Sequence, residues 1–415
     1  NRFINNNVEK IFIKNKKKLI GSVNVSGAKN AALPLMALSL IINKDYNLNN
    51  VPDLADTRLM SNLLIDLGIK INWKKGKLNF YGKPVKDEAS YDLVRQMRAS
   101  ILVLGPLLAS KGSAKVPLPG GCAIGSRPID LHVMVMKALG ANITLDSGFI
   151  IGSLNKDGLK GGIIDFPKVS VGATESAIMT AVLARGETKI LNAAKEPEIT
   201  DLSNCLNKAG ADIKGIGTSN LIINGVEQLN KVSHSVVSDR IEAGSFAIAS
   251  SITKGNVEIN NINPKNLTEF INVLKYTGSE IEISENSIKV MCLQRPRPLN
   301  VATDPYPGFP TDLQAQLMVL MTQAKGLSKI KENIFENRFM HVPELKRMGA
   351  KIEIKDKVAY ILGPSKLTGA EVMATDLRAS VSLVLAGLVA DNRTIINRIY
   401  HLDRGYEYLE TKLKN

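Results

Sequence analysis

Hydrophobic and polar positions repeat in a regular order along the chain, and this order predicts alternating strands and helices. Segments such as residues 97–108 and 377–388 place apolar side chains at helical spacing among Ala, Ser and Gly, which predicts helices packed on all sides. Segments such as residues 255–259 and 351–354 alternate with period two, which predicts half-exposed strands. The chain therefore reads as strand, helix, strand, helix, strand, many times over.

Two landmarks show that this order is a true internal repeat. A charged or hydroxyl residue opens an apolar helix six times, at intervals of 66 to 76 residues: Lys29, Arg98, Thr174, Glu242, Asp312 and Arg378. A glycine at the end of a second helix keeps step with it: Gly68, Gly140, Gly210, Gly278 and Gly349. A fixed period of this kind indicates one supersecondary unit used repeatedly.

Six units in 415 residues divide into three plus three, since a chain of this length exceeds a single hydrophobic core. We predict an α/β protein of two domains, each with three βαβαβ units around buried helices, and an active-site cleft between them. The expected boundaries are residues 29–236 for one domain, and residues 1–28 plus 237–415 for the other.

The residues that open the six helices have two interpretations. A helix N-terminus favours anions, so openings that face one cleft would bind an anionic ligand. Alternatively, each residue simply caps its own helix. The sequence leaves both open.

Residues 118–132 interrupt the repeat with a glycine-rich loop flanked by Pro119 and Pro128. Glycines give backbone freedom and prolines fix the ends, as a mobile lid requires. The loop carries Cys122 and Arg127, and we favour a reactive thiol over a buried small side chain. Cys205 and Cys292 lie in apolar patterns and are predicted core residues.

Arginines stand at further landmarks: Arg338, Arg378 and Arg404. The planar guanidinium suits bidentate binding of carboxylate and phosphate, so several such residues, with Lys29, favour a substrate carrying both anions. Asp312 lies among these cations. It could act as a general base, orient a hydroxyl group, or cap a helix.

Composition excludes several classes of function. The longest apolar runs are 12 residues, shorter than a membrane span of roughly 20. Three cysteines without metal-type spacing indicate a reducing cytoplasm. The net charge of +14 comes largely from dispersed lysines with few aromatics, which is typical of a solvated surface rather than a nucleic-acid track.

Seven motifs carry a resemblance to a known family. They lie, in order, at residues 26–31, 97–100, 119–132, 172–176, 309–312, 336–341 and 403–406. From about Ile20 to the C-terminus, the sequence resembles the enolpyruvyl transferases that act on UDP-N-acetylglucosamine. The resemblance implies two inside-out α/β barrel domains of three repeats each. It also implies transfer of enolpyruvyl from phosphoenolpyruvate to the 3′-hydroxyl of the sugar nucleotide, through a tetrahedral ketal, with loss of phosphate.

The resemblance also implies roles for single residues. Lys29, Arg127 and Arg404 would hold the phosphate, Arg338 and Arg378 the carboxylate with help from Asn30, and Asp312 would receive or orient the hydroxyl proton. Cys122 matches the proton donor to the methylene group and the site of alkylation by fosfomycin. Positions matching the nucleotide-sugar site are Arg98, Arg127, Pro128, Ile129, Asp130, Leu131, Lys168, Val169, Ser170, Val171, Asp312 and Ile334.

The family further implies a monomer in the cytoplasm that needs no metal and no cofactor, and that serves peptidoglycan synthesis, hence cell shape and division. It implies no nucleic-acid partner and no membrane. A sister enzyme acting on shikimate 3-phosphate is the first alternative, but its pattern lacks the cysteine-bearing lid and the 127–131 segment. A basic nucleic-acid clamp is the second, and predicts salt-sensitive DNA binding.

Overall fold

The computed structural model describes residues 2–5, 8–14, 18–119 and 129–414. These residues form two compact units. The first unit lies within Gly27–Val237, and the second combines Asn1–Ser26 with Ser238–Asn415. Cys122, Arg127 and Pro128 lie outside the described residues.

In the first unit, three described sheets have the strand orders β14-β4-β6-β5, β7-β9-β8 and β10-β11-β13-β12. The strands are β4 (Tyr46–Asn49), β5 (Lys70–Lys74), β6 (Lys77–Tyr81), β7 (Ser113–Pro117), β8 (Ala141–Asp146), β9 (Phe149–Leu154), β10 (Ile163–Asp165), β11 (Glu187–Leu191), β12 (Asp212–Lys214), β13 (Leu221–Asn224) and β14 (Val232–Ser235). The helices are α1 (Lys29–Ala37), α2 (Ala55–Asp66), α3 (Tyr91–Val94), α4 (Leu104–Lys111), α5 (Asp130–Ala138), α6 (Val171–Ala181) and α7 (Pro197–Lys208), with short 3-10 helices η1 (Leu38–Leu40) and η2 (Arg98–Val103).

In the second unit, the three described sheets are β1-β2-β23-β22, β16-β17-β15-β3 and β18-β19-β21-β20. The strands are β1 (Arg2–Asn5), β2 (Val8–Ile13), β3 (Ile20–Asn24), β15 (Asn256–Asn260), β16 (Glu280–Ile283), β17 (Ser287–Met291), β18 (Asn300–Ala302), β19 (Gly326–Lys331), β20 (Ile352–Lys355), β21 (Val358–Gly363), β22 (Glu371–Met373) and β23 (Thr394–Asn397). The helices are α8 (Arg240–Ile252), α9 (Thr268–Tyr276), α10 (Gln314–Met321), α11 (Val342–Arg347), α12 (Leu377–Val389) and α13 (Leu409–Lys412), with 3-10 helices η3 (Pro264–Leu267), η4 (Thr311–Leu313) and η5 (Ile399–Arg404).

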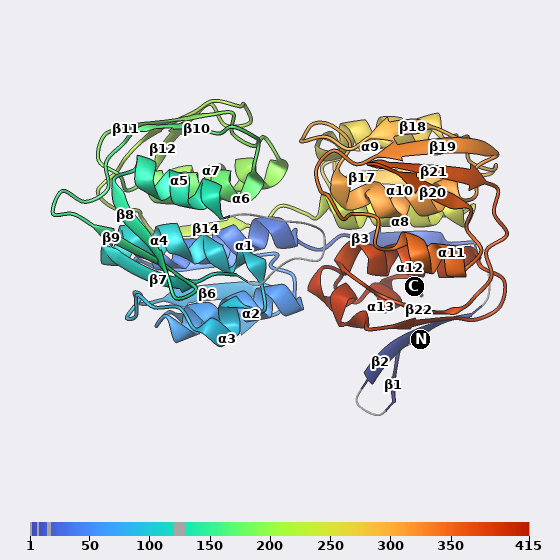
Figure 1. Cartoon of the computed structure of the whole chain (residues 1–415), viewed down its shortest axis with the longest axis horizontal. Helices are drawn as coiled ribbons and strands as arrows, with labels where there is room; N and C mark the ends of the chain where they lie inside the picture. The colour runs from blue at the N-terminus through green and yellow to red at the C-terminus, as the bar shows by residue number, and fades with distance from the viewer. Residues whose placement is uncertain (1, 6–7, 15–17, 120–128, 415) are drawn as a thin grey trace. The chain divides into compact units, whose positions relative to one another are not determined.

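Each unit packs its sheets on the outside, around inner helices (Figure 1). The inner helices are α1, α4 and α6 in the first unit, and α8, α10 and α12 in the second. Every residue of α8 and of α10 is buried. Small residues permit this close packing on all sides, and they confirm the prediction of interior helices.

The repeat appears in the structure with one additional strand. The third repeat, for example, has the order β10, α6, β11, α7, β12, β13, and β12 pairs antiparallel with β13. The alternating segments after each second helix are hairpins, such as β5–β6 around Lys75 and Gly76, both with positive φ. All five glycine landmarks also have positive φ, between +89° and +107°, so each ends its helix in the left-handed region.

The second unit is discontinuous in sequence because β3, from the N-terminal segment, pairs parallel with β15. In the first unit, β14 pairs parallel with β4 in the same way. The chain therefore passes between the units twice. The two connecting segments are hydrogen-bonded to each other within each unit. In the second unit Asp239 N donates to Ser26 O at 2.8 Å, and in the first unit Ala28 N donates to Val237 O at 2.7 Å.

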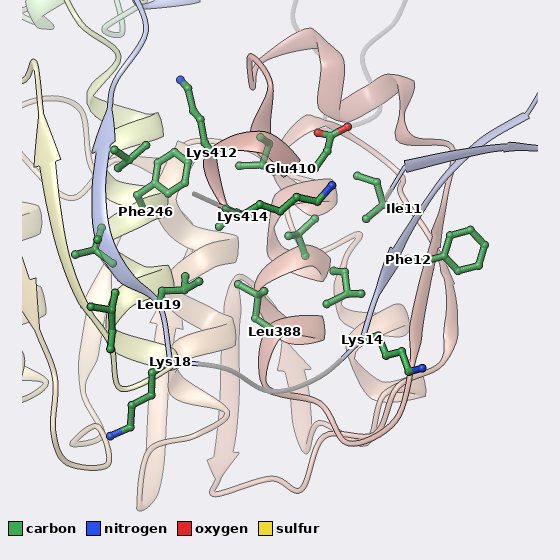
Figure 2. A pocket seen from close by; sticks show the side chains of 18 of the residues that line it. Ile11, Phe12, Lys14, Lys18, Leu19, Phe246, Leu388, Glu410, Lys412 and Lys414 are labelled. Carbon is green, nitrogen blue, oxygen red and sulfur yellow. The ribbon is translucent and has the colours of Figure 1, made fainter.

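A cavity of about 1010 Å³ lies in the second unit between β2, β3, α12 and the C-terminal residues. Figure 2 shows apolar side chains such as Phe246 and Leu388 there, together with Lys18 and Lys412. None of the described residues of the predicted active site lines it. Within the described residues, no helix has both the length and the apolar character needed to cross a bilayer.

Gly27, where the chain enters the first unit, lies in close contact with a neighbouring backbone segment. A Cβ on Gly27 would lie 1.8 Å from the backbone oxygen of Asn50. We predict that Gly27→Ala lowers the free energy of unfolding by about 1 to 3 kcal/mol, measured by urea denaturation. Gly172→Ala, whose Cβ would meet its nearest neighbour at 3.5 Å, is the control and should leave stability unchanged or slightly higher. Equal stability of Gly27→Ala and the wild type would contradict this packing.

Candidate active site

The second unit holds two arginines on one carboxylate. Arg338 Nη2 donates to Asp312 Oδ1 at 2.7 Å, and Arg378 Nη2 donates to Asp312 Oδ2 at 2.8 Å. The Arg378 side chain is 6% exposed, whereas that of Asp312 is 24% exposed. Two guanidinium groups thus meet at one carboxylate that solvent reaches, and the excess of positive charge over negative there favours an anionic ligand.

The repeat brings Asp312 and Arg378 together. Both lie in the first turn of the inner helical segments, Asp312 in η4 before α10 and Arg378 in α12. The α12 N-terminus is capped by Asp376, whose Oδ1 accepts from Arg378 N at 2.7 Å and Ala379 N at 3.0 Å. Asp376 therefore satisfies the helix end and leaves the Arg378 side chain for other contacts.

The capping interpretation of the repeat landmarks is wrong for the residues that the sequence singled out. The side-chain caps of α6, α8 and α12 are Ser170, Asp239 and Asp376. Pro310 stands at the cap position of η4, so Asp312 does not cap it and pairs with arginines instead.

Burial alone would lower the pKa of Arg378, but the influences of Asp312, Tyr406 and Asp239 together outweigh that cost. The pKa of Arg378 is therefore raised, and its guanidinium keeps its charge although it is removed from water. A permanent, buried cation of this kind binds carboxylate without competition from deprotonation.

A buried carboxylate fixes the loop that carries Ile334. Glu332 accepts from Thr311 Oγ1 at 3.0 Å and from Ile334 N at 2.9 Å, and is 1% exposed. The Ile334 loop is thereby tied to the residue next to Asp312. The Phe335 ring lies 5.3 Å from Arg338 Cζ and packs against that guanidinium.

Arg404 is the last residue of η5. It lies close in sequence to Tyr406, whose hydroxyl accepts a hydrogen bond from Arg378 Nη1. Gly405 packs against Leu377, and a Cβ there would lie 2.6 Å from Leu377 Cδ1. This close approach brings the segment that carries Arg404 to the start of α12. Arg404 itself is half-buried, and its charge contributes to the lowered pKa of His401, after burial.

In the first unit, Lys29 forms an ion pair with a buried carboxylate. Lys29 Nζ lies 3.1 Å from Asp56 Oδ2, and both side chains are largely shielded from water. Lys29 begins α1, so its ammonium group adds to the positive end of an inner helix. Asn30 follows it and is exposed.

A second group in the first unit centres on His132. Its Nδ1 lies 2.8 Å from Ser176 Oγ, and its ring lies against Gly172. Burial, and then the charge of Arg98, lower the pKa of His132 to about 4, so the imidazole is neutral at pH 7. This histidine thus joins the Arg98 segment, the start of α5 and the start of α6.

In the first unit, the described residues among the predicted nucleotide-sugar positions lie in the segments around this histidine. Ile129, Asp130 and Leu131 lead into His132 at the start of α5. Lys168 and Val169 precede Ser170, which caps α6 and accepts from Ala173 N at 3.3 Å, and Val171 begins that helix. The side chains of Asp130 and Lys168 are exposed, which leaves them accessible to a ligand.

The structure thus brings Asp312, Arg338 and Arg378 together in the second unit, and the Arg98, 129–131 and 168–171 segments in the first. Cys205 and Cys292 are buried, which confirms their prediction as core residues. Asp56, His132, Glu332 and Tyr406 were not predicted as site residues. His132 and Tyr406 are the last residues of the 119–132 and 403–406 motifs, but no local pattern indicated their partners.

Among residues 2–5, 8–14, 18–119 and 129–414, no three His, Cys, Asp or Glu side chains come together to hold a metal ion. Lys29, Arg338 and Arg378 are cations paired with carboxylates. Such cations can bind an anionic ligand and stabilise its charge.

Comparison with known proteins defines the class. The family model of EPSP synthase (3-phosphoshikimate 1-carboxyvinyltransferase) matches residues 13–413. The chain therefore belongs to this family of enolpyruvyl transferases. The enolpyruvyl transferase NikO from Streptomyces tendae shares the fold with a TM-score of 0.89 at 24% identity, over 98% of this chain and 97% of that one. EPSP synthase from Acinetobacter baumannii shares it with a TM-score of 0.71 at 20% identity, over 93% of each chain.

Sequence relatives narrow the class further. The chain is 51% identical to UDP-N-acetylglucosamine 1-carboxyvinyltransferase of Zymomonas mobilis, over 98% of this chain and 97% of the relative. It is 52% identical to the protein of the same name from Rickettsia canadensis, over 98% of each chain. These comparisons confirm the resemblance on which the residue roles were predicted.

The lowered pKa of His132 makes a testable contribution to stability. Between pH 6.5 and about 4 the unfolded chain binds a proton that the folded His132 does not, so stability is lost as pH falls through this window. We predict that His132→Asn loses less stability than the wild type from pH 7 to pH 4, by about 3 kcal/mol. Urea denaturation at several pH values measures this difference. Parallel pH profiles of the two proteins would contradict the neutral, partly buried state of His132.

Proposed function

We propose that this protein transfers the enolpyruvyl group of phosphoenolpyruvate to the 3′-hydroxyl of UDP-N-acetylglucosamine and releases phosphate. The observation that carries this proposal is the Arg338–Asp312–Arg378 cluster, an anion-binding arrangement beside a carboxylate, in a chain about half identical to enzymes of that name. Residues of both units act on the same pair of substrates.

Phosphoenolpyruvate carries a carboxylate and a phosphate, and the cations divide between them. Arg378 and Arg338 bind the carboxylate, with Asn30 assisting. Lys29, Arg127 and Arg404 bind the phosphate and stabilise its charge as it departs. The ion pair between Lys29 and Asp56 supports this role, because it holds the ammonium group in place before substrate binds.

The reaction proceeds by addition and then elimination. The 3′-hydroxyl oxygen bonds to C2 of phosphoenolpyruvate while C3 gains a proton, which gives a tetrahedral ketal. Loss of phosphate and of a proton from C3 then restores the double bond in the product. Asp312 receives or orients the hydroxyl proton, and Cys122 supplies the proton to C3.

The nucleotide sugar is bound mainly by the first unit. The segment of Arg127, Pro128, Ile129, Asp130 and Leu131 binds beside the uracil, and Lys168, Val169, Ser170 and Val171 bind near the diphosphate. Arg98, Asp312 and Ile334 complete the set. The helix start at Ser170 and Val171 supports this assignment, because helix N-termini favour anions. The neutral His132 leaves the local positive charge to Arg98 and Lys168.

The same proposal places the protein in the cytoplasm as a monomer that needs no metal or cofactor, in the first committed step of peptidoglycan synthesis, and hence in cell wall biogenesis, cell shape and division. The dispersed lysines do not suggest nucleic acid as a partner. The sister reaction on shikimate 3-phosphate is the alternative that the family itself contains, and substrate choice separates the two.

Phosphate release tests the reaction directly. The wild type should release phosphate from phosphoenolpyruvate only when UDP-N-acetylglucosamine is also present, and not with shikimate 3-phosphate. Asp312→Ala should lower this rate by roughly 100-fold or more, because general acid–base groups contribute 10²–10⁴-fold, while both substrates still bind in calorimetry. Release with shikimate 3-phosphate alone would overturn the substrate assignment, and near-normal turnover of Asp312→Ala would remove Asp312 from its role.

Cys122 is tested by alkylation. We predict that fosfomycin adds one adduct mass to the wild type, and none to Cys122→Ser, because only the thiolate is a sufficient nucleophile. Cys205→Ser is the matched control, since Cys205 is buried and its pKa is raised to about 12 by burial; it should be alkylated like the wild type. Intact-mass spectrometry reads the result. An adduct on Cys122→Ser would show that another residue reacts.

A further inference from the structure

The buried guanidinium of Arg378 has a second contact that the proposed mechanism does not use. Its Nη1 donates to the Tyr406 hydroxyl at 3.3 Å, while its Nη2 donates to Asp312. The Tyr406 ring also lies 5.7 Å from Arg378 Cζ. Tyr406 is 2% exposed, so this phenol lies in the interior of the unit.

The hydrogen-bond directions around Tyr406 follow from the neighbouring side chains. Ser245 Oγ donates to Ile241 O at 2.8 Å, which uses its only proton. The Tyr406 hydroxyl therefore donates to Ser245 Oγ, at 2.8 Å. Its oxygen is left to accept from Arg378 Nη1. Burial raises the pKa of Tyr406, so the phenol keeps the proton that this arrangement requires.

Gln316 connects the two partners of Arg378. Its Nε2 donates to the backbone oxygen of Asp312 at 2.9 Å, and lies 3.3 Å from the Tyr406 hydroxyl and 3.2 Å from Ser245 Oγ. Gln316 and Ser245 are buried in α10 and α8. The orientation of the guanidinium is therefore set by residues from α8, α10, η4 and the 403–406 segment.

We propose that Tyr406, held by Ser245 and Gln316, is a positioning residue that fixes the plane of the Arg378 guanidinium for the carboxylate of phosphoenolpyruvate. A guanidinium binds carboxylate well only when its planar fork faces the ligand. Asp312 restrains one side of this fork and the phenol oxygen the other. Without the hydroxyl, Nη1 loses a buried acceptor and the fork turns away. The inference rests on the proposed role of Arg378.

Tyr406→Phe tests this role, because it removes the hydroxyl and keeps the ring. The KM for phosphoenolpyruvate should rise about tenfold, the range expected for a buried hydrogen bond to a charged group. The KM for UDP-N-acetylglucosamine and kcat should change little, because the carboxylate is bound equally before and in the transition state. Ser245→Ala, which removes the acceptor of the phenol proton, should shift the same KM in the same direction by about threefold, and serves if Tyr406→Phe does not fold.

Tyr46→Phe is the matched control. Tyr46 is also buried, and its hydroxyl donates to Leu35 O at 2.8 Å, but no arginine contact depends on it. It should lower stability without changing either KM. A rise in the phosphoenolpyruvate KM for Tyr46→Phe equal to that for Tyr406→Phe would overturn the inference, because the effect would then be one of general stability.

Arg378→Ala separates the inference from the proposed function. It should raise the same KM by more than Tyr406→Phe does, and Tyr406→Phe should add nothing on this background. An unchanged KM in Arg378→Ala would refute the carboxylate role of Arg378 itself. A raised KM there, with an unchanged KM in Tyr406→Phe and Ser245→Ala, would refute only the positioning role of Tyr406.

Discussion

A cation withdrawn from water needs a negative partner and acceptors for its protons, and Arg378 shows how this protein meets that requirement. Its side chain is 6% exposed, and its contacts are the carboxylate of Asp312 and the phenol of Tyr406. Leaving such a charge unpaired in the interior would cost several kcal/mol. The charge cannot be removed by deprotonation either, so the surroundings must be built around it.

The internal repeat explains how these groups meet. Asp312 and Arg378 stand at equivalent positions of successive copies, and the packing of their inner helices side by side brings equivalent first turns together. The scaffold is thus one supersecondary unit used repeatedly, and chemistry resides in the few polar residues that differ between copies. In the first unit the same principle joins the Arg98 segment to the start of α6 through His132.

Much of the fold could be predicted from the sequence, because the buried helices and the glycine landmarks are local patterns with a period. The extra strand of each repeat was missed, since two short alternating segments joined by a tight turn look like one. The predicted site residues are those that differ between copies or lie in the recognised motifs. Their supporting partners were not predicted: Asp56 meets Lys29, and Glu332 meets Thr311, across more than 20 residues of sequence. Such contacts depend on tertiary packing and leave no periodic signal.

The central claim is that Arg378 binds the carboxylate and Lys29 the phosphate of one phosphoenolpyruvate molecule. A crystal structure with UDP-N-acetylglucosamine and phospholactate, which keeps both anionic groups but lacks the reacting double bond, measures this directly. The account predicts hydrogen bonds from the Arg378 guanidinium to the carboxylate and from the Lys29 ammonium to the phosphate. A phospholactate molecule bound in contact with neither side chain would contradict it.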